Sequence, residues 1–230
     1  MEVDVVIPVH DGARFVRRAL ESIRSQDVPE PVTVYVVDDA STDGTPQLLR
    51  ELAESDGSLR ILTNDRNRGV STSRNRGVAA GSGSIVAFLD QDDAWSPGKL
   101  AAQLAVFRER PEVGYVVGRQ RIVVDEGATR PAWCRPEWLL APQAGYLPST
   151  LALRRSTFDL VGPFDESLWA GGDDTDWFAR ARRMAVPHVA LDDAVITRFV
   201  HDANLSSDRR TSDELLKLVR RHLEAGEAGG

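Results

Sequence analysis

Three carboxylates lie within four positions, at Asp90, Asp92 and Asp93, immediately after the apolar run at residues 85–89. Carboxylates held so close together repel one another, and each is costly to remove from water. Oxygen ligands of this kind suit a hard divalent cation such as Mg²⁺ or Mn²⁺, which offsets the repulsion and can also bridge to phosphate oxygens. A solvated acidic turn that caps the following helix through Asp93 or Ser96 would explain the same residues. The cluster alone therefore leaves a cation site and a capping turn open.

A second acidic pair, Asp38 and Asp39, follows the apolar residues 33–37. A carboxylate at such a strand end can accept hydrogen bonds from a base or a ribose hydroxyl, or it can satisfy the backbone of its own turn. Phosphoacceptor receiver domains also carry an acidic pair, but after their first strand and together with a lysine late in the fold. Here the pair follows the second expected strand, and no lysine lies between Lys99 and Lys217. The sequence therefore disfavours a receiver domain.

Other polar residues with chemical potential lie at the starts of two expected helices and after one strand. The helix start near residue 71 suits an anion, which Arg74 and Asn75 could reach, although an exposed arginine is usually only solvated. The acidic residues in the first helical turn at 173–176 either interact favourably with the helix dipole or place a general base in a cleft. His201 lies just past a strand, three residues after Arg198. A lone histidine is more often structural than a ligand, so this signal is weak by itself.

The elements that must position these residues alternate along the first 90 residues. Apolar, β-branched runs predict strands at 3–9, 33–37, 59–62 and 85–89, and helical spacing predicts helices at 13–25, from 45 onward and at 71–80. Such alternation implies an α/β fold, with a mainly parallel sheet covered by helices on both faces. Ligands bind such sheets outside the carboxyl ends of the strands. We therefore expect one crevice lined by His10, Asp38, Asp39, Asp90 and Asp92.

The second half of the chain has a different character. We expect a helix at 97–110, a strand at 114–124, an irregular loop over the crevice at 129–148 and a short strand at 151–153. A helix at 173–184, a strand at 195–200 and a last helix at 212–224 follow. The organisation predicted is one domain over residues 1–206, with a nucleotide-binding half at 1–95 and an acceptor-side half at 96–206. Residues 207–230 are expected to form a C-terminal helix and a flexible tail.

Composition excludes several classes of protein. The 230 residues carry a formal net charge of −7, which argues against a nucleic-acid partner. The single cysteine, Cys134, excludes an internal disulfide. No apolar run approaches the roughly 18 residues needed to span a bilayer, and the acidic start of the chain is unlike a signal peptide. We therefore expect a cytoplasmic protein without a membrane span.

Taken together and in order, the motifs resemble those of the family 2 glycosyltransferases, which have the GT-A fold. The resemblance covers roughly residues 3–206 and is carried by VVIPVHDG, VVDDASTDGT, NRGVSTSRNRG, IVAFLDQDDAW, GPFDESL, GGDDTDW and RFVHDANLS. It implies a smaller acceptor-side region beside a Rossmann-like sheet. It also implies a nucleotide-diphosphate-sugar donor and Mg²⁺ or Mn²⁺ as cofactor.

The resemblance also assigns roles to individual residues. Donor binding falls to Pro8, Val9 and His10 beside the base, to Asp39 as its hydrogen-bond partner, to Arg74 and Asn75 on the diphosphate and sugar side, and to Asp90. Asp90 and Asp92 form the DXD motif, with Asp92 as the direct metal ligand, and His201 approaches the metal or the diphosphate. Asp174 is the expected catalytic base. Two departures stand out: His10 and Asp11 replace the usual Tyr-Asn, and Asp173 replaces a glutamate.

The expected reaction is non-processive transfer of one sugar, with a UDP-sugar as the expected donor, to an acceptor hydroxyl with inversion. The acceptor, a glycan, lipid-linked sugar, natural product or peptide, is left open, and a homodimer is allowed. Specificity for the acceptor is expected to lie in residues 129–148 and around Trp169. Trp95, Trp169 and Trp177 could offer sugar-stacking surfaces, or could pack in the core. One alternative is a non-catalytic GT-A subunit that binds nucleotide-sugar. A less favoured alternative is a sugar nucleotidyltransferase, because residues 10–14 of this chain match poorly the glycine-rich loop that those enzymes carry after their first strand.

Overall fold

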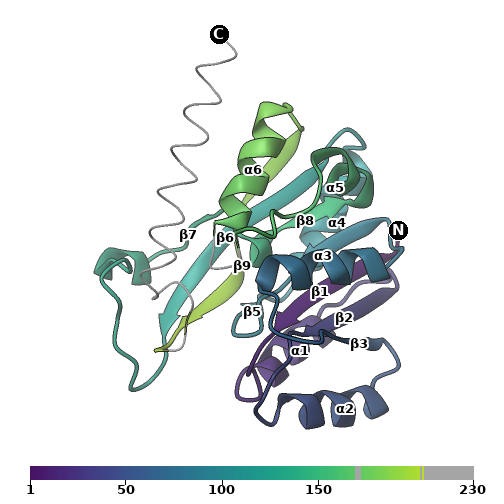
Figure 1. Cartoon of the computed structure of the whole chain (residues 1–230). Coiled ribbons are helices and arrows are strands. Elements are labelled where there is room, and N and C mark those ends of the chain that lie inside the picture. The colour runs from purple at the N-terminus through teal and green to yellow at the C-terminus, as the bar shows by residue number, and fades with distance from the viewer. Residues whose placement is uncertain (169–171, 203, 205–230) are drawn as a thin grey trace.

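The computed structural model describes residues 1–168, 172–202 and 204 of the chain. In this part of the chain a nine-stranded mixed sheet has the order β3-β2-β1-β4-β8-β6-β9-β5, with β7 paired to β6 (Figure 1). The expected last helix at 212–224 and Trp169 lie outside the described residues. No helix among the described residues is both long and apolar enough to cross a membrane.

The first half of the chain builds the parallel part of the sheet. The register pairs β1 with β2 and β4, and β2 with β3, all parallel. The helices between these strands are amphipathic or lie against the sheet, as the alternation predicts. The elements are β1 (Val3–Val9), α1 (Val16–Arg24), β2 (Val32–Asp38), α2 (Thr45–Ser55), β3 (Leu59–Thr63), α3 (Val70–Ala80) and β4 (Ile85–Phe88).

The second half extends the same sheet with mostly antiparallel pairs. β8 pairs antiparallel with β4 and with β6, while β9 runs parallel to β6. The sheet is therefore wholly parallel from β3 to β4, and it becomes mixed beyond β4. The elements are β5 (Ala94–Trp95), α4 (Lys99–Glu109), β6 (Tyr115–Val124), β7 (Gln143–Gly145), β8 (Ala152–Arg154), α5 (Arg155–Val161), α6 (Asp173–Arg183) and β9 (His188–Val200), with 3₁₀ turns η1 (Pro136–Leu139) and η2 (Pro148–Thr150).

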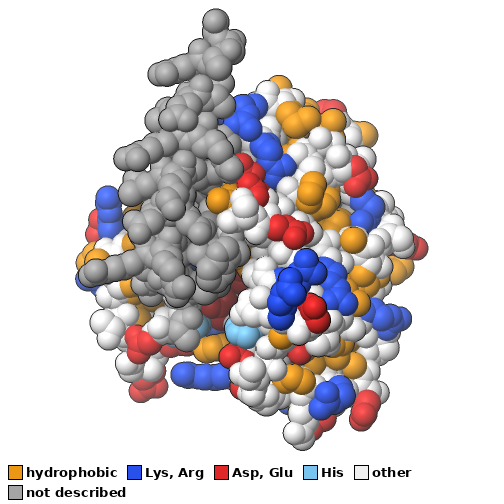
Figure 2. Space-filling model, in the orientation of Figure 1, with side chains coloured by type: hydrophobic (Ala, Val, Ile, Leu, Met, Phe, Trp, Pro, Cys, Tyr) orange, Lys and Arg blue, Asp and Glu red, His pale blue; other side chains and the backbone are white. Residues whose placement is uncertain are grey.

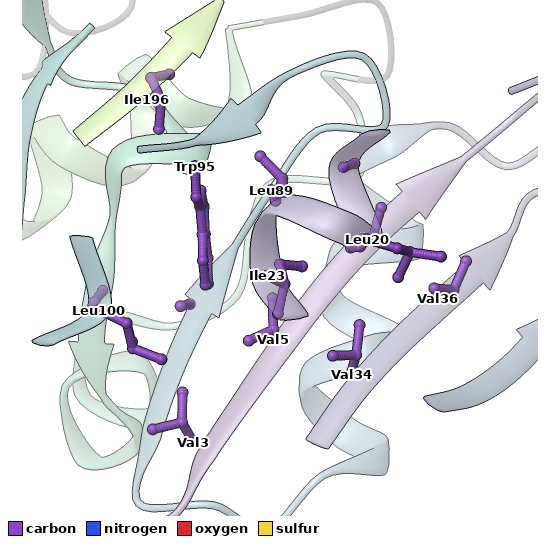
Figure 3. Packing of buried hydrophobic residues seen from close by; sticks show 14 of the residues in the cluster. Val3, Val5, Leu20, Ile23, Val34, Val36, Leu89, Trp95, Leu100 and Ile196 are labelled. Atoms are coloured by element: carbon purple, nitrogen blue, oxygen red, sulfur yellow. The ribbon is translucent and has the colours of Figure 1, made fainter. Parts of the chain in front are cut away.

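Alternating side chains of the central strands fill two cores, one on each face of the sheet. Val5 and Ile7 join the core under α1, α2 and α4, and Val6 joins the core under α3, α5 and α6. Figure 3 shows the first core, in which Leu20 and Ile23 of α1 point at the strands and the Trp95 ring stands beside Leu100. The prediction of helices on both faces is confirmed.

Two of the three tryptophans considered for sugar stacking are core residues. Trp95 is 3% exposed and Trp177 is 0% exposed. Each indole also donates to backbone, Trp95 to the carbonyls of Phe88 and Ser149 and Trp177 to that of Gly162. The sugar-stacking alternative is therefore wrong for Trp95 and Trp177, and the core-packing alternative holds for both.

The capping alternative for the acidic turn at residues 90–93 is also wrong. Helix α4 begins at Lys99 after Gly98, whose φ of 77° is in the left-handed region, and no side chain caps it. Among the described residues neither the Asp93 nor the Ser96 side chain accepts a hydrogen bond from the helix start, and Ser96 meets it only through its carbonyl, which accepts from the Lys99 N–H. Asp93 is instead buried in the loop, where its N–H donates to the Asp90 carbonyl.

Candidate active site

The loop after β4 directs its carboxylates in different directions. The Asp90 N–H donates to Ser149 Oγ at 3.0 Å, which fixes the start of the loop against η2. The Asp90 carboxylate accepts from Arg74 through Oδ1. Asp92 faces the end of β9, where its Oδ2 lies 3.1 Å from His201 Nε2 and accepts from Asn204 Nδ2 at 2.9 Å. The DXD pair therefore divides: Asp90 belongs to an internal ion pair, and Asp92 belongs to a cluster with His201.

Arg74 of α3 joins the two halves of the site. Its Nη2 donates to Asp90 Oδ1 at 2.5 Å and its Nη1 to Asp173 Oδ2 at 2.6 Å. The side chain is buried, and burial by itself lowers its pKa, but the charges of Asp90 and Asp173 more than offset this and raise the pKa above its ordinary value. Because its guanidinium forms ion pairs with both carboxylates, Arg74 fixes α3, the Asp90 loop and the start of α6 relative to one another.

Asp174 stands beside this ion pair on the first turn of α6. Its Oδ1 accepts from the Thr175 N–H at 2.6 Å. Desolvation, and then the charge of Asp173, raise the pKa of Asp174 to about 6, while Arg74 opposes the rise. A carboxylate with a pKa near the working pH can accept a proton during bond formation. Asp174 therefore has the electrostatic setting of a general base.

The His201 ring packs against helix α1 and against Phe15, the residue that precedes this helix. Its ring stacks on Phe15, with ring centroids 4.3 Å apart and an interplanar angle of 14°. Arg18 lies one turn along, donates to the Asp92 carbonyl at 2.8 Å and covers the Phe199 ring at 3.4 Å. His201 is 5% exposed, and its Nδ1 has no hydrogen-bond partner among the residues that the structure describes. The imidazole is thus oriented by packing, with Nε2 directed at Asp92.

The donor atoms of Asp92 and His201 fit a small divalent cation. Two ligands in neighbouring positions of an octahedron with bonds of about 2.1 Å lie roughly 3 Å apart, and Asp92 Oδ2 and His201 Nε2 are 3.1 Å apart. Within residues 1–168, 172–202 and 204, no set of three or more His, Cys, Asp or Glu side chains is placed to hold a metal. Mg²⁺ ordinarily takes one or two protein ligands and completes its shell with phosphate oxygens and water. The pair therefore fits a cation whose binding is shared with a diphosphate.

The surface view agrees with this arrangement. On the face shown in Figure 2, acidic side chains and the pale blue of histidine lie together in a hollow near the centre, with Lys and Arg side chains beside it. A recess that gathers both carboxylates and imidazole is suited to a cation and a phosphorylated ligand.

Asp93 shares the loop but not the surface. Desolvation, and then the charges of Asp92 and Asp90, raise the pKa of Asp93 well above its ordinary value. A carboxyl group buried in this way favours its neutral form.

Asp39 is buried at the end of β2 and organises the next loop. Its N–H donates to the Val9 carbonyl at 2.7 Å. Its carboxylate accepts from Asn64 Nδ2 at 2.6 Å and from the N–H groups of Arg68 and Gly69 at 2.9 and 2.8 Å. Three of about four acceptor positions are thereby occupied. The structure thus gives Asp39 a turn-forming role, which the sequence left open, beside the base-binding role that the resemblance implies.

The three residues expected beside the base differ in what they present. Pro8 and Val9 are buried within β1, whereas the His10 side chain is 40% exposed. His10 Nδ1 lies 2.9 Å from the Asp39 carbonyl oxygen, so the ring is tied to β2. The His10 N–H donates to Gln91 Oε1, and Gln91 Nε2 donates back to the His10 carbonyl. Gln91, which lies between Asp90 and Asp92, is a positioning residue that the sequence analysis missed.

Asn75 lies on α3, and its side chain contacts residues of the acceptor-side half. Its Nδ2 donates to the Phe164 carbonyl at 2.9 Å and to Glu166 Oε1 at 3.1 Å, and its Oδ1 accepts from the Phe164 N–H at 2.9 Å. Glu166 also accepts from Thr72 Oγ1. The amide expected on the diphosphate and sugar side therefore binds the residues of GPFDESL. The presence of that motif in the sequence was the signal for this contact.

The sequence of the chain is similar to those of known glycosyltransferases. A family model described as Glycosyl transferase family 2 matches residues 4–163. The glycosyltransferase AglE of Haloferax volcanii is 30% identical over 223 residues, covering 94% of this chain and 69% of its own length. An uncharacterized glycosyltransferase of Nostoc sp., alr2836, is 29% identical over 190 residues, and the match covers 74% of this chain but 56% of the relative.

Solved structures give the same fold. TarS 1–349 of S. aureus, in complex with UDP-GlcNAc, superposes with a TM-score of 0.76 at 20% identity, covering 96% of this chain and 65% of that one. The mannosyltransferase PcManGT of Pyrobaculum calidifontis, in complex with GDP-Man and Mn²⁺, gives a TM-score of 0.74 at 23% identity, covering 100% and 65%. The expected GT-A fold is confirmed, and the chain spans only part of the length of several of these proteins.

Proposed function

Because the chain belongs to glycosyltransferase family 2, we propose that it transfers a sugar from a nucleotide-diphosphate-sugar to an acceptor hydroxyl with inversion of the anomeric centre. The observation that carries the proposal is the meeting of three parts at one end of the sheet. These parts are the Asp92 and His201 pair, the ion pairs of Arg74, and Asp174 with its raised pKa.

The donor's diphosphate is proposed to bind over Asp92 and His201 together with Mg²⁺ or Mn²⁺. A divalent cation bound there would neutralise charge on the departing nucleotide diphosphate. The complex of PcManGT with GDP-Man and Mn²⁺ supports this expectation. Asp90 keeps its Oδ2 without a hydrogen bond from the described residues, so it can accept from a donor hydroxyl while Arg74 fixes its orientation.

The base of the nucleotide is proposed to lie against His10, between the ends of β1 and β2. The exposed ring edge of His10 is fixed by its contact with the Asp39 carbonyl, and the remaining acceptor position of Asp39 is available to a base N–H. A UDP-sugar is the expected donor, and the UDP-GlcNAc complex of TarS supports it. Arg74 and Asn75 would then act on the donor side mainly by holding Asp90 and residues 164–166 in place.

Asp174 is proposed to accept the proton of the acceptor hydroxyl while that oxygen attacks the anomeric carbon. Attack takes place opposite the departing diphosphate, so the product has inverted configuration. Thr175 orients the half-buried Asp174 carboxylate through a backbone hydrogen bond, and desolvation together with the charge of Asp173 raises its pKa to about 6, which suits a base.

Donor turnover and binding test this function. Nucleotide sugars that raise the melting temperature in the presence of Mn²⁺ identify the donor, and release of nucleotide from that donor then measures hydrolysis and transfer. We expect Asp174→Asn to abolish turnover while Mn²⁺-dependent nucleotide binding stays intact. Asp159→Asn, an exposed carboxylate of α5, is the matched control and should turn over normally. Normal turnover by Asp174→Asn would refute the base, and donor binding without any turnover by the wild type would favour a non-catalytic subunit.

A further inference from the structure

With Trp95 and Trp177 in the cores, the described aromatic surface on the acceptor-side half is carried by other residues. Tyr146 follows β7, inside the segment expected to cover the crevice, and is 48% exposed. Its ring meets Phe178 of α6 edge to face, with centroids 5.4 Å apart and an interplanar angle of 88°. Phe178 itself is only partly buried. The two rings therefore present an apolar surface to solvent.

This ring pair lies next to the proposed base. Phe178 and Asp174 are four residues apart in α6, so their side chains leave neighbouring turns on one side of the helix. The rise over four residues is about 6 Å. That separation is on the scale of a single sugar ring.

The backbone and the second core hold the ring pair in place. Gly145 pairs with Gly118 of β6, where an added Cβ would meet the Gly118 carbonyl oxygen at 2.5 Å. Thr150 Oγ1 donates to the Gly145 carbonyl, which ties the strand to η2. Phe178 packs edge to face on Trp177, with centroids 5.5 Å apart. A surface fixed in this way pays little ordering entropy when a ligand lies on it.

We propose that Tyr146 and Phe178 form an acceptor subsite for a sugar ring, so that the acceptor is a saccharide. One ring of the acceptor presents its hydroxyl to Asp174, and the next ring lays its apolar C–H face on the aromatic pair. Aromatic side chains suit such a ligand, because they bury apolar area while leaving its hydroxyls in water. This inference rests on the proposed function and adds the chemical class of the acceptor.

Direct saccharide binding tests the subsite without requiring turnover. Mono-, di- and trisaccharides of glucose, N-acetylglucosamine and mannose would be titrated by NMR onto the full chain loaded with UDP and Mn²⁺. We expect the wild type to bind at least one di- or trisaccharide and to bind the matching monosaccharide more weakly. Tyr146→Ala should weaken that binding about tenfold, whereas Tyr146→Phe, which keeps the ring, should stay within about twofold.

Control measurements separate the possible outcomes. Leu140→Ala changes an apolar residue of the same segment that is 84% exposed, and it should bind the saccharide as the wild type does. UDP affinity should be equal in all variants. Unchanged saccharide binding by Tyr146→Ala, or no saccharide binding by a wild type that binds UDP, overturns the subsite. A smaller apparent mass of Tyr146→Ala in size-exclusion chromatography would assign the ring pair to an interface between copies and also overturn it. Failure of the wild type to bind any nucleotide sugar would refute the proposed function itself.

Discussion

Replacing Arg74 by methionine removes the guanidinium that joins Asp90 to Asp173 while keeping a long side chain in the same space. Arg74 and Asp173 are 4% and 3% exposed, so neither charge is screened by water. Breaking a buried ion pair by removing one partner costs about 3–5 kcal/mol, because the remaining charge is left without compensation. The Asp90 side chain is 30% exposed and can recover some hydration. Most of the loss in unfolding free energy should therefore come from Asp173.

Urea unfolding at neutral pH measures this loss, and a double-mutant cycle assigns it. Arg74→Met should lower the unfolding free energy by about 3–5 kcal/mol. Adding Asp173→Asn should restore part of it, because the methionine then faces a neutral amide, and the coupling should exceed about 1 kcal/mol. Arg76→Met is the matched control on the same helix, since Arg76 is exposed and donates to the Thr63 carbonyl and Asn64.

The control defines the result that would refute this reasoning. A surface arginine of this kind should contribute within about 1 kcal/mol. If Arg74→Met lowers the unfolding free energy no more than Arg76→Met does, the bridge is not what holds α3 to α6. A full loss that Asp173→Asn fails to reduce would instead show that packing, and not charge, is responsible.

Three further predictions concern proton transfer, a buried lysine and stereochemistry. Because the pKa of Asp174 in the free protein is raised to about 6, kcat/KM should fall as pH drops below about 6, and a pH profile of kcat/KM without this acidic limb would contradict the assignment. Burial lowers the pKa of Lys99 well below its ordinary value, so the unfolded chain binds more protons and stability rises with pH below 10.5. Urea unfolding at about pH 7 and about pH 9 should show this rise in unfolding free energy in the wild type but not in Lys99→Met. An equal change in unfolding free energy between the two pH values in both proteins would exclude a lowered pKa of Lys99 as the cause. Proton NMR of the product from an α-linked donor should show a β-linkage, and an α-linkage would exclude inversion.

Much of the fold could be predicted because the first half carries simple patterns. Apolar runs bounded by polar turns give β1 to β4, and the helical spacing between them gives α1 to α3. The second half was harder to predict. Strand β9 begins at His188, seven residues before the predicted start, because its first part is largely exposed and the adjacent Asp192 and Asp193 interrupt its apolar residues. Helix α5 has only seven residues, too few for a periodic pattern, and β5 has only two.

Candidate site residues could be proposed from the sequence, but most contacts among them could not be predicted. Asp92 and His201, both assigned to the metal by the resemblance, lie side by side although 109 positions separate them in the sequence. The partners of Arg74 could not be predicted, because Asp90 and Asp173 lie 16 and 99 positions away and only the fold decides which carboxylate is in reach. The role of Gln91 depends on the backbone of His10, which leaves no mark in residue type.

Nucleotide binding with and without a cation tests the central claim most directly. UDP and GDP would be titrated calorimetrically into the wild type and into Asp92→Ala, each with Mn²⁺ and with chelator. We predict that the wild type binds one of the two nucleotides tightly only in the presence of Mn²⁺, and that Asp92→Ala loses most of this cation-dependent affinity. Equal affinity of the wild type with and without Mn²⁺, or unchanged Mn²⁺-dependent affinity in Asp92→Ala, would contradict a cation held by Asp92 against the donor's diphosphate.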